Sequence, residues 1–182
     1  WHYSRPVYEQ GAYKSARQVM QMLSDVVSKN GCLLLNIPVR GDGTIDDKEE
    51  AILDEIGAWT ARNGEAIYAT RPWHRYGEGP TESAPPEAFG EGSQKPYTAQ
   101  DVRFTKKDDA LYAIFLDWPQ GESALASLGR TALPDARIER IDLLGGPELT
   151  FRREADALRL TLPPPQDGAF TPAIRIRGRG LV

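Results

Sequence analysis

The chain has 182 residues, 40% of them hydrophobic, and a formal net charge of −4. This length allows one or two packed domains, whereas a complete (β/α)8 barrel needs roughly 200 residues or more. The mild acidity lacks the basic patch of a nucleic-acid-binding protein, and no apolar run approaches the roughly 18 residues of a membrane span.

The first elements are predicted in the order loop, helix and strand. Residues 1–13 read as an aromatic loop, and apolar residues then recur at helical spacing over residues 14–29, before the helix stop Asn30-Gly31. Residues 32–38 are a continuous apolar run, typical of a strand covered on both faces. Cys32 is the single cysteine, which excludes an intrachain disulfide and a cysteine-based metal cluster. Because it begins this run, we predict a small buried hydrophobe.

A turn-rich loop over residues 39–45 precedes a second predicted helix over residues 46–63. Asp46 fits the N-cap of this helix, with Glu49 placed to reach back to the N–H of the cap residue. Gly64 follows as the expected left-handed C-cap. Strand, loop and helix together form the unit from which parallel α/β barrels are built.

The composition changes over residues 77–96, where glycine and proline punctuate a segment with little to bury. This pattern predicts a linker between the C-terminal part of a (β/α)8 barrel, residues 1–76, and a separate domain, residues 97–182. The hydrophobic period in this second domain is two, which favours an antiparallel β-sandwich. Its strands are predicted at residues 102–105, 111–116, 123–127, 137–143, 149–151, 158–162 and 173–176.

Chain direction assigns residues to the two ends of the barrel. The strand 32–38 runs toward the catalytic face, so the loop after it and residues 1–13 lie on that face. The helix 46–63 returns to the opposite end, which is the end associated with stability. Glu65 is therefore expected to satisfy backbone groups at the helix exit rather than to act as an acid.

Three residues on the catalytic face are the candidates for substrate contact: Trp1, His2 and Asn36. An aromatic ring such as Trp1 offers a flat apolar surface to a sugar, although packing of the loop on the barrel rim is the alternative. Asn36 could reach a ligand or tie the next loop in place. Tyr3 is more readily explained by rim packing, and Asp42 between two glycines by turn formation.

The other residues that could carry chemistry are expected to have structural roles. Trp59 is expected in the core, whereas Trp73 and Trp118 are expected in interdomain or sandwich packing, with carbohydrate contact as the alternative. The sequence contains no nucleophile constellation, no convincing phosphate loop and no close-spaced set of metal ligands. We therefore assign no catalytic residue and no metal to this chain.

Several motifs together resemble the C-terminal part of the glycoside hydrolase family 29 α-L-fucosidases, that is, the end of the catalytic barrel and a C-terminal β-sandwich. They are Trp1-His2-Tyr3, residues 31–37, Asp42-Gly43-Thr44-Ile45, Ile56-Gly57-Ala58-Trp59 and residues 63–68, with residues 101–105, 111–114 and 143–145 in the second half. Two departures affect the outer subsite: His2 stands where the family commonly has glycine, and Pro38 also replaces a glycine.

The resemblance implies a retaining exo-hydrolase that removes terminal α-L-fucose from a fucosylated oligosaccharide or glycoconjugate. The family's aspartate nucleophile and glutamate acid/base lie on earlier barrel strands, and neither motif is present here. The expected partner is therefore a missing N-terminal barrel segment, and residues 1–182 alone are expected to be inactive. In this family an aromatic residue lines the fucose pocket, and the resemblance implies this role for Trp1 only. No metal or organic cofactor is implied, and the family suggests a secreted, periplasmic or lysosomal protein.

An alternative reading is a non-catalytic module with an inactive barrel remnant. In this case residues 101–182 would bind glycan, or would simply cover the barrel surface.

Overall fold

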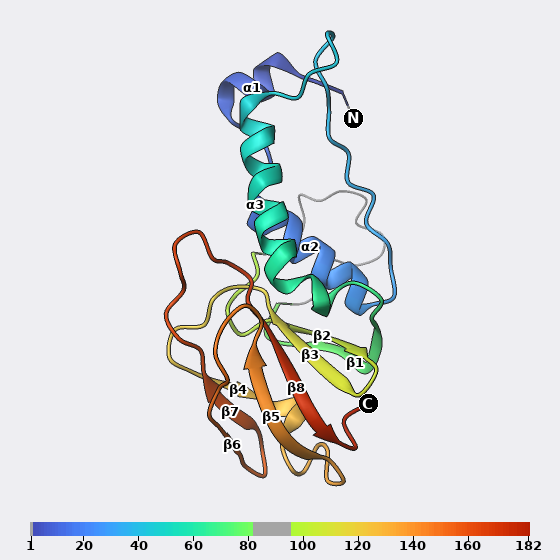
Figure 1. Ribbon diagram of the computed structural model, residues 1–182, viewed down its shortest axis with the longest axis vertical. Coiled ribbons are helices and arrows are strands. Elements are labelled where there is room, and N and C mark those ends of the chain that lie inside the picture. The colour runs from blue at the N-terminus through green and yellow to red at the C-terminus, as the bar shows by residue number, and fades with distance from the viewer. Residues whose placement is uncertain (1, 82–95) are drawn as a thin grey trace.

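A computed structural model describes residues 2–81 and 96–182, and Figure 1 shows a helical part above a β-rich part. Of the residues singled out above, Trp1 lies outside the described residues, as does most of the predicted linker over residues 77–96. The helices of the first part are α1 (Arg5–Gln10), α2 (Ala16–Ser28) and α3 (Asp47–Asn63), followed by the 3₁₀ turn η1 (Gly64–Ala66).

The two predicted long helices are confirmed as α2 and α3. Helix α2 begins with a capping box in which the Ser15 hydroxyl accepts from the Gln18 backbone N–H and the Gln18 side chain accepts from the Ser15 N–H. Asp46 caps α3, since its carboxylate accepts from the backbone N–H groups of Lys48 and Glu49, both at 3.0 Å. The side chain of Glu49 makes no return bond to the cap N–H among the described hydrogen bonds.

The prediction of a left-handed Gly64 is wrong. This residue has φ −59° because α3 continues directly into η1 instead of reversing. A Cβ atom there would approach the Tyr68 ring to 3.0 Å, so the glycine permits a close contact at the helix exit.

The predicted strand over residues 32–38 is also absent from the described structure, where these residues are extended but unpaired. A β-strand needs a neighbour to satisfy its backbone N–H and C=O groups, and no neighbouring strand lies beside this segment in the described part of the chain. Leu34 is consequently 80% exposed. Cys32 is exposed as well, which corrects the prediction that it is buried.

The second part contains two antiparallel sheets, as expected for a sandwich. One has the order β1-β2-β3-β8-β5 and the other the order β4-β7-β6. The strands are β1 (Arg71–Glu78), β2 (Val102–Lys107), β3 (Ala110–Phe115), β4 (Glu122–Leu125), β5 (Arg137–Leu143), β6 (Phe151–Arg153), β7 (Leu158–Thr161) and β8 (Ala173–Arg179).

Strand β1 was not anticipated from the sequence. It is an edge strand that begins Arg71-Pro72 and buries little beyond Trp73, so it lacks the alternation that identifies the other strands. The predicted division between residues 76 and 77 falls inside β1, which pairs with β2. The larger sheet therefore starts before the glycine- and proline-rich segment.

Strand β3 is buried along its whole length because both faces of the larger sheet are covered. Leu111, Ala113 and Phe115 face the core between the two sheets. The alternate residues of β3 pack instead with apolar residues of α2 and α3. The β-sandwich is thus continuous with the helical layer, and Figure 1 shows both helices lying against this end of the sheet.

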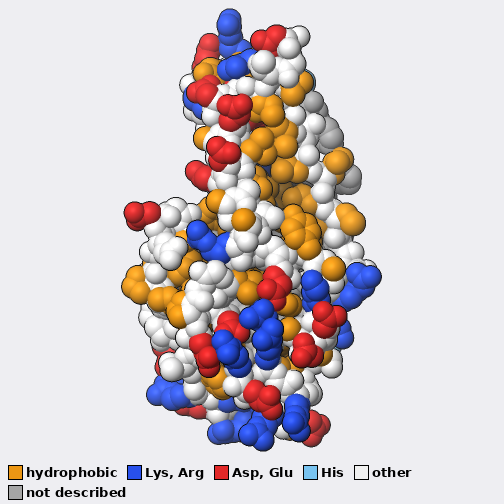
Figure 2. Space-filling view, viewed as in Figure 1, with side chains coloured by type: hydrophobic (Ala, Val, Ile, Leu, Met, Phe, Trp, Pro, Cys, Tyr) orange, Lys and Arg blue, Asp and Glu red, His pale blue; other side chains and the backbone are white. Residues whose placement is uncertain are grey.

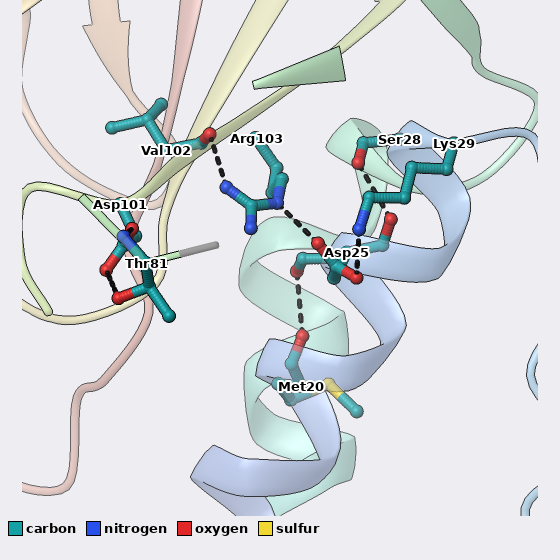
Figure 3. Close-up of polar contacts among 9 residues, drawn as sticks. Met20, Asp25, Ser28, Lys29, Thr81, Asp101, Val102 and Arg103 are labelled. Carbon is teal, nitrogen blue, oxygen red and sulfur yellow. Dashed lines mark hydrogen bonds and ion pairs between the residues drawn. The ribbon is translucent and has the colours of Figure 1, made fainter. Parts of the chain in front are cut away.

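Polar contacts connect the helices to the sheet. The Trp59 indole donates to the Thr171 carbonyl at 2.9 Å, and the Thr105 hydroxyl donates to the Ala66 carbonyl at 2.7 Å. The Arg103 guanidinium on β2 forms an ion pair with Asp25 on α2 at 2.6 Å, as Figure 3 shows. These buried bonds fix the orientation of the helical part on the sandwich.

Candidate functional site

A cavity of about 600 Å³ lies between the first residues of the chain, the unpaired segment 33–38 and the facing sides of α2 and α3. His2 and Asn36 both line this cavity, as does Tyr3. Figure 2 shows apolar side chains gathered over the upper part of the molecule, where these helices lie. The fold thus brings the predicted substrate contacts among the described residues to one cavity.

Asn36 has an exposed side chain, and no hydrogen bond of its amide is recorded within the described chain. No bond from this amide to the loop that follows, residues 39–45, is recorded among the described residues. That loop is closed by its own groups, because Asp42 accepts from the Thr44 N–H at 3.0 Å and from the Thr44 hydroxyl at 2.7 Å. This confirms Asp42 as a turn former, and the pKa of its carboxyl is lowered by these bonds.

The rim of the cavity is organised around Arg40. Its guanidinium lies 5.9 Å from the centre of the Tyr3 ring and 5.5 Å from that of Tyr8. The Tyr8 hydroxyl in turn donates to Asp47 at 3.0 Å. These contacts hold the beginning of the chain against the loop that precedes α3, and they give Tyr3 the packing role expected of it.

Asp46 connects the same two segments below the rim. Its carboxylate is buried and accepts from the Tyr13 hydroxyl at 2.6 Å while it caps α3. Burial opposes ionisation of this carboxyl, but the bonds from Tyr13 and from the two cap N–H groups outweigh it, so its pKa is lowered. The pKa of Tyr13 is raised by burial and by its bond to the carboxylate.

Glu49 is the residue of this cavity that sequence reasoning missed, since it was assigned to the helix cap. It is only 7% exposed, and its Oε2 atom has no hydrogen-bond partner. Burial, followed by the negative charge of Asp46, raises its pKa. Glu49 is also the one carboxyl among the described residues that line the cavity. The helical spacing of the sequence predicts that Glu49 is half-buried, but it does not predict that its Oε2 atom lacks a hydrogen-bond partner.

Glu65 lies at the other end of α3, in agreement with the structural role predicted for it. Its partners differ from those expected, because its carboxylate accepts from the Tyr112 hydroxyl at 2.7 Å and from Arg175 at 3.0 Å. Burial raises the pKa of Glu65, but these bonds outweigh it and lower the pKa overall. The residue therefore bridges the end of the helical part to β3 and β8.

Glu65→Gln is expected to lower the free energy of unfolding at pH 7 by about 1 kcal/mol, because the pair is partly exposed. The folded state lowers the pKa of Glu65, so its stabilisation is present above the unfolded pKa and is lost as the pH falls. Urea denaturation at pH 7 and at about pH 3.5 measures both effects, the lower pH lying below the usual glutamate value. Glu55→Gln, on the exposed side of α3, is the matched control. Equal losses for the two variants would contradict the bridge.

The described part of the chain holds no group of three or more histidine, cysteine, aspartate or glutamate side chains that could bind a metal ion. Among its helices, none has both the length and the apolar character needed to cross a membrane.

Comparison with known proteins finds two matches along this chain. The family described as Alpha-L-fucosidase matches residues 1–65, and the Alpha-L-fucosidase C-terminal domain matches residues 94–176. The plasma alpha-L-fucosidase of Rattus norvegicus is 33% identical over 159 residues, which are 83% of this chain and 29% of the relative. The tissue enzyme of the same species is 29% identical over 93% of this chain and 32% of its own length.

Solved structures agree with these sequence matches. The alpha-fucosidase of Thermotoga maritima, solved with a mechanism-based inhibitor, has a TM-score of 0.64 and 29% identity over 90% of this chain and 34% of its own. Alpha-L-fucosidase isoenzyme 1 of Paenibacillus thiaminolyticus has a TM-score of 0.65 and 27% identity, over 92% of this chain and 35% of the isoenzyme chain. The chain thus spans about a third of the length of these relatives.

Proposed function

Because this chain belongs to the alpha-L-fucosidase family, we propose that it forms part of a retaining exo-α-L-fucosidase that hydrolyses terminal α-L-fucose from glycans. The observation that carries this proposal is the pair of family matches, which together extend over residues 1–65 and 94–176. In domain terms, residues from 1 to about 70 contribute to a catalytic barrel, and the β-sandwich begins with β1.

The number of carboxyl groups lining the cavity supports an active site whose catalytic residues come partly from another segment of the barrel. A retaining glycosidase needs two carboxyl groups roughly 5–5.5 Å apart, one as nucleophile and one as acid/base. The described residues lining the cavity include a single carboxyl, that of Glu49, and the neighbouring Asp46 is engaged as a helix cap. We therefore place the nucleophile and the acid/base on other strands of the barrel, outside these residues.

The unpaired segment 32–38 supports the same arrangement. Its apolar side chains include Leu34, 80% exposed, and Leu35, 41% exposed, on a backbone without recorded hydrogen bonds to other described segments. Such an edge is a template for strand pairing. In the proposed enzyme this segment is a barrel strand flanked by neighbours, with Asn36 near its catalytic end.

Substrate contacts in this proposal come from Trp1, His2 and Asn36. His2 and Asn36 line the same cavity, which supports their joint assignment. Trp1 directly precedes His2 in the sequence, and its role as a wall for the fucose ring comes from the family resemblance alone. The sandwich has a structural role here, since its larger sheet covers the inner sides of α2 and α3.

Purified residues 1–182 are expected to release no detectable aryl group from an aryl α-L-fucoside, because a lone carboxyl cannot supply both catalytic roles. A polypeptide that also carries the remaining barrel strands is expected to hydrolyse the same substrate and to release fucose first as the α anomer. Spectrophotometric turnover and NMR of the initial product measure the two results.

Each result tests a separate part of the proposal. Turnover by residues 1–182 alone would refute the placement of catalytic residues on another segment of the barrel, whereas an inactive longer polypeptide would refute the fucosidase function. In the active polypeptide, Asn36→Ala is expected to lower kcat/KM about tenfold, the usual consequence of losing one hydrogen bond to a substrate. Equal urea midpoints for variant and parent would show that this loss is not one of folding.

A further inference from the structure

A second, smaller cavity of about 170 Å³ lies at the opposite end of α3 from the candidate site. It is bounded by the last turn of α3, the turn between β5 and β6, and the loop between β7 and β8. Figure 1 shows these segments meeting where the helical part joins the sandwich. We call it the junction groove, and the residues that matter for its chemistry are Arg62, Trp118, Pro147, Pro163 and Phe170.

Trp118 provides a fixed aromatic wall. Its indole N–H donates to the Pro163 carbonyl at 3.1 Å, and its backbone N–H donates to the Asp117 carboxylate at 2.8 Å. The side chain is half-buried and lines the groove together with proline rings from two loops. An aromatic ring whose polar atom is already satisfied presents an apolar face at little entropic cost, as stacking on a sugar ring requires.

Arg62 provides a positive charge without a counter-charge. It lies in the last turn of α3 with an exposed side chain, and no ion pair or hydrogen bond of its guanidinium is recorded in the described part of the molecule. Its aliphatic stem crosses Gly145, which has φ +70° and where a Cβ atom would clash with the Arg62 Cγ. Glycine at this turn therefore lets the arginine reach along the groove.

The loop between β7 and β8, which contributes Phe170 and Pro172 to the groove, is strained at Thr171, the residue between them. Thr171 has φ +45°, which is rare for a β-branched residue, and its buried hydroxyl has no partner. Bonds from the Trp59 indole to the Thr171 carbonyl and from the Ala173 N–H to the Asn63 amide keep the loop in place. Strain maintained by surrounding contacts is typical of preformed binding sites.

We propose that the junction groove binds a single sugar ring that carries a carboxylate, with Trp118 against the ring and Arg62 on the carboxylate. The cavity is below the roughly 300 Å³ of common ligand pockets, so it suits one ring rather than an oligosaccharide. The guanidinium favours a planar anion, which it can hold through two parallel hydrogen bonds. The choice of a sugar rather than another ring-bearing acid rests on the proposed action on glycans.

The groove is separate from the candidate site, because α3 extends between them from the rim to the junction. The two cavities share no lining residue among the described residues. The groove is therefore an anchoring site that holds an acidic branch of a glycoconjugate.

Titration of ¹⁵N-labelled residues 1–182 with methyl β-D-glucuronide tests this inference, and methyl β-D-glucoside is the neutral control. The acidic sugar is expected to shift the Trp118 indole N–H signal saturably, and to bind about tenfold more tightly than the neutral sugar. Arg62→Gln should reduce the affinity for the acidic sugar to that for the neutral one. Arg137→Gln, at an exposed arginine on β5, should leave the affinity unchanged.

Equal binding of the two sugars, shifts that do not saturate, or an unchanged affinity in Arg62→Gln would overturn the inference. Because Arg62 is exposed, its variant is expected to fold, which an unaltered pattern of the other amide signals verifies. The readout involves no turnover. Failure of binding here therefore leaves the fucosidase proposal standing, and an inactive enzyme leaves the groove test unaffected.

Discussion

Arg103→Met is expected to lower the free energy of unfolding by about 3 kcal/mol, the usual cost of removing one partner from a buried ion pair. The Arg103 side chain is 3% exposed and that of Asp25 is 16% exposed, at a separation of 2.6 Å. The guanidinium also donates to the Val102 carbonyl at 3.0 Å and lies 5.6 Å from the centre of the Tyr76 ring and 5.3 Å from that of the Tyr97 ring. Methionine keeps much of the volume but removes the buried partner of the Asp25 carboxylate, whose other ion pair is with the more exposed Lys29, at 2.7 Å.

Figure 3 shows that Arg103 extends from β2 and Asp25 from α2. Loss of this ion pair should therefore also weaken the packing of α2 on the larger sheet. Urea denaturation followed by tryptophan fluorescence measures the change. Arg152→Met is the matched control, because its ion pair with Glu122 is equally short, at 2.6 Å, but 66% and 45% exposed. An exposed pair contributes less than about 1 kcal/mol. Equal losses in the two variants would show that burial does not strengthen the Arg103 pair.

Asp101→Asn is expected to destabilise the fold by about 3 kcal/mol at pH 7, because a buried carboxylate that accepts several hydrogen bonds is replaced by a group with one acceptor. Asp101 is fully buried at the start of β2. Its Oδ2 accepts from the Thr98 N–H at 2.7 Å and from the hydroxyls of Thr98 and Thr81, and its Oδ1 accepts from the Thr81 N–H at 2.9 Å. In the variant, the amide NH2 would replace one of these oxygens and would point toward the N–H and O–H donors of Thr81 or Thr98, with which it cannot form hydrogen bonds as an acceptor.

The effect of Asp101→Asn should depend on pH in a defined direction. Burial raises the pKa of this carboxyl, but the bonds from the Thr98 and Thr81 groups outweigh it and lower the pKa in the folded state. A lowered pKa gives stability that is present above the unfolded value, near 3.9, and is lost as the pH falls below it. The difference between the parent and the variant should therefore shrink as the pH falls through about 4 toward 2.5.

Asp108→Asn is the control for Asp101→Asn, since it makes the same change on an exposed turn that joins the same strand to β3. Asp108 has φ +52°, a conformation that asparagine also adopts, so the change should be nearly neutral. A constant difference between parent and Asp101→Asn across this pH range would contradict the role given to the ionised carboxylate.

Local patterns in the sequence predicted the elements that depend on near neighbours. Helices α2 and α3, the Asp46 cap and the Asp42 turn follow from spacing and from side chains within a few residues. Strand β5, Arg137–Leu143, has the predicted bounds, although a register shift between Ile138 and Arg140 interrupts its alternation. The motifs around residues 31–68 likewise led to the family that the comparisons support.

Features that depend on distant residues were not predictable in this way. Strand β1 was missed because its pairing with β2 crosses a long stretch of sequence, and segment 32–38 is unpaired because strand formation requires a neighbour that periodicity does not report. Cys32 is exposed for the same reason. Whether the Oε2 atom of Glu49 finds a hydrogen-bond partner depends on which groups surround it in three dimensions.

The sequence by itself determined helices α2 and α3, the family and the scaffold role of Glu65, but not α1, which lies within the predicted loop 1–13. Each of these follows from residue type, spacing and chain direction. The tertiary structure alone decided that the larger sheet is covered on both faces, so that helices and sandwich form one continuous body linked by Arg103 and Asp25. The reason is physical: periodicity shows that a face is apolar, whereas the partner that covers it is selected by contacts between residues far apart in the chain.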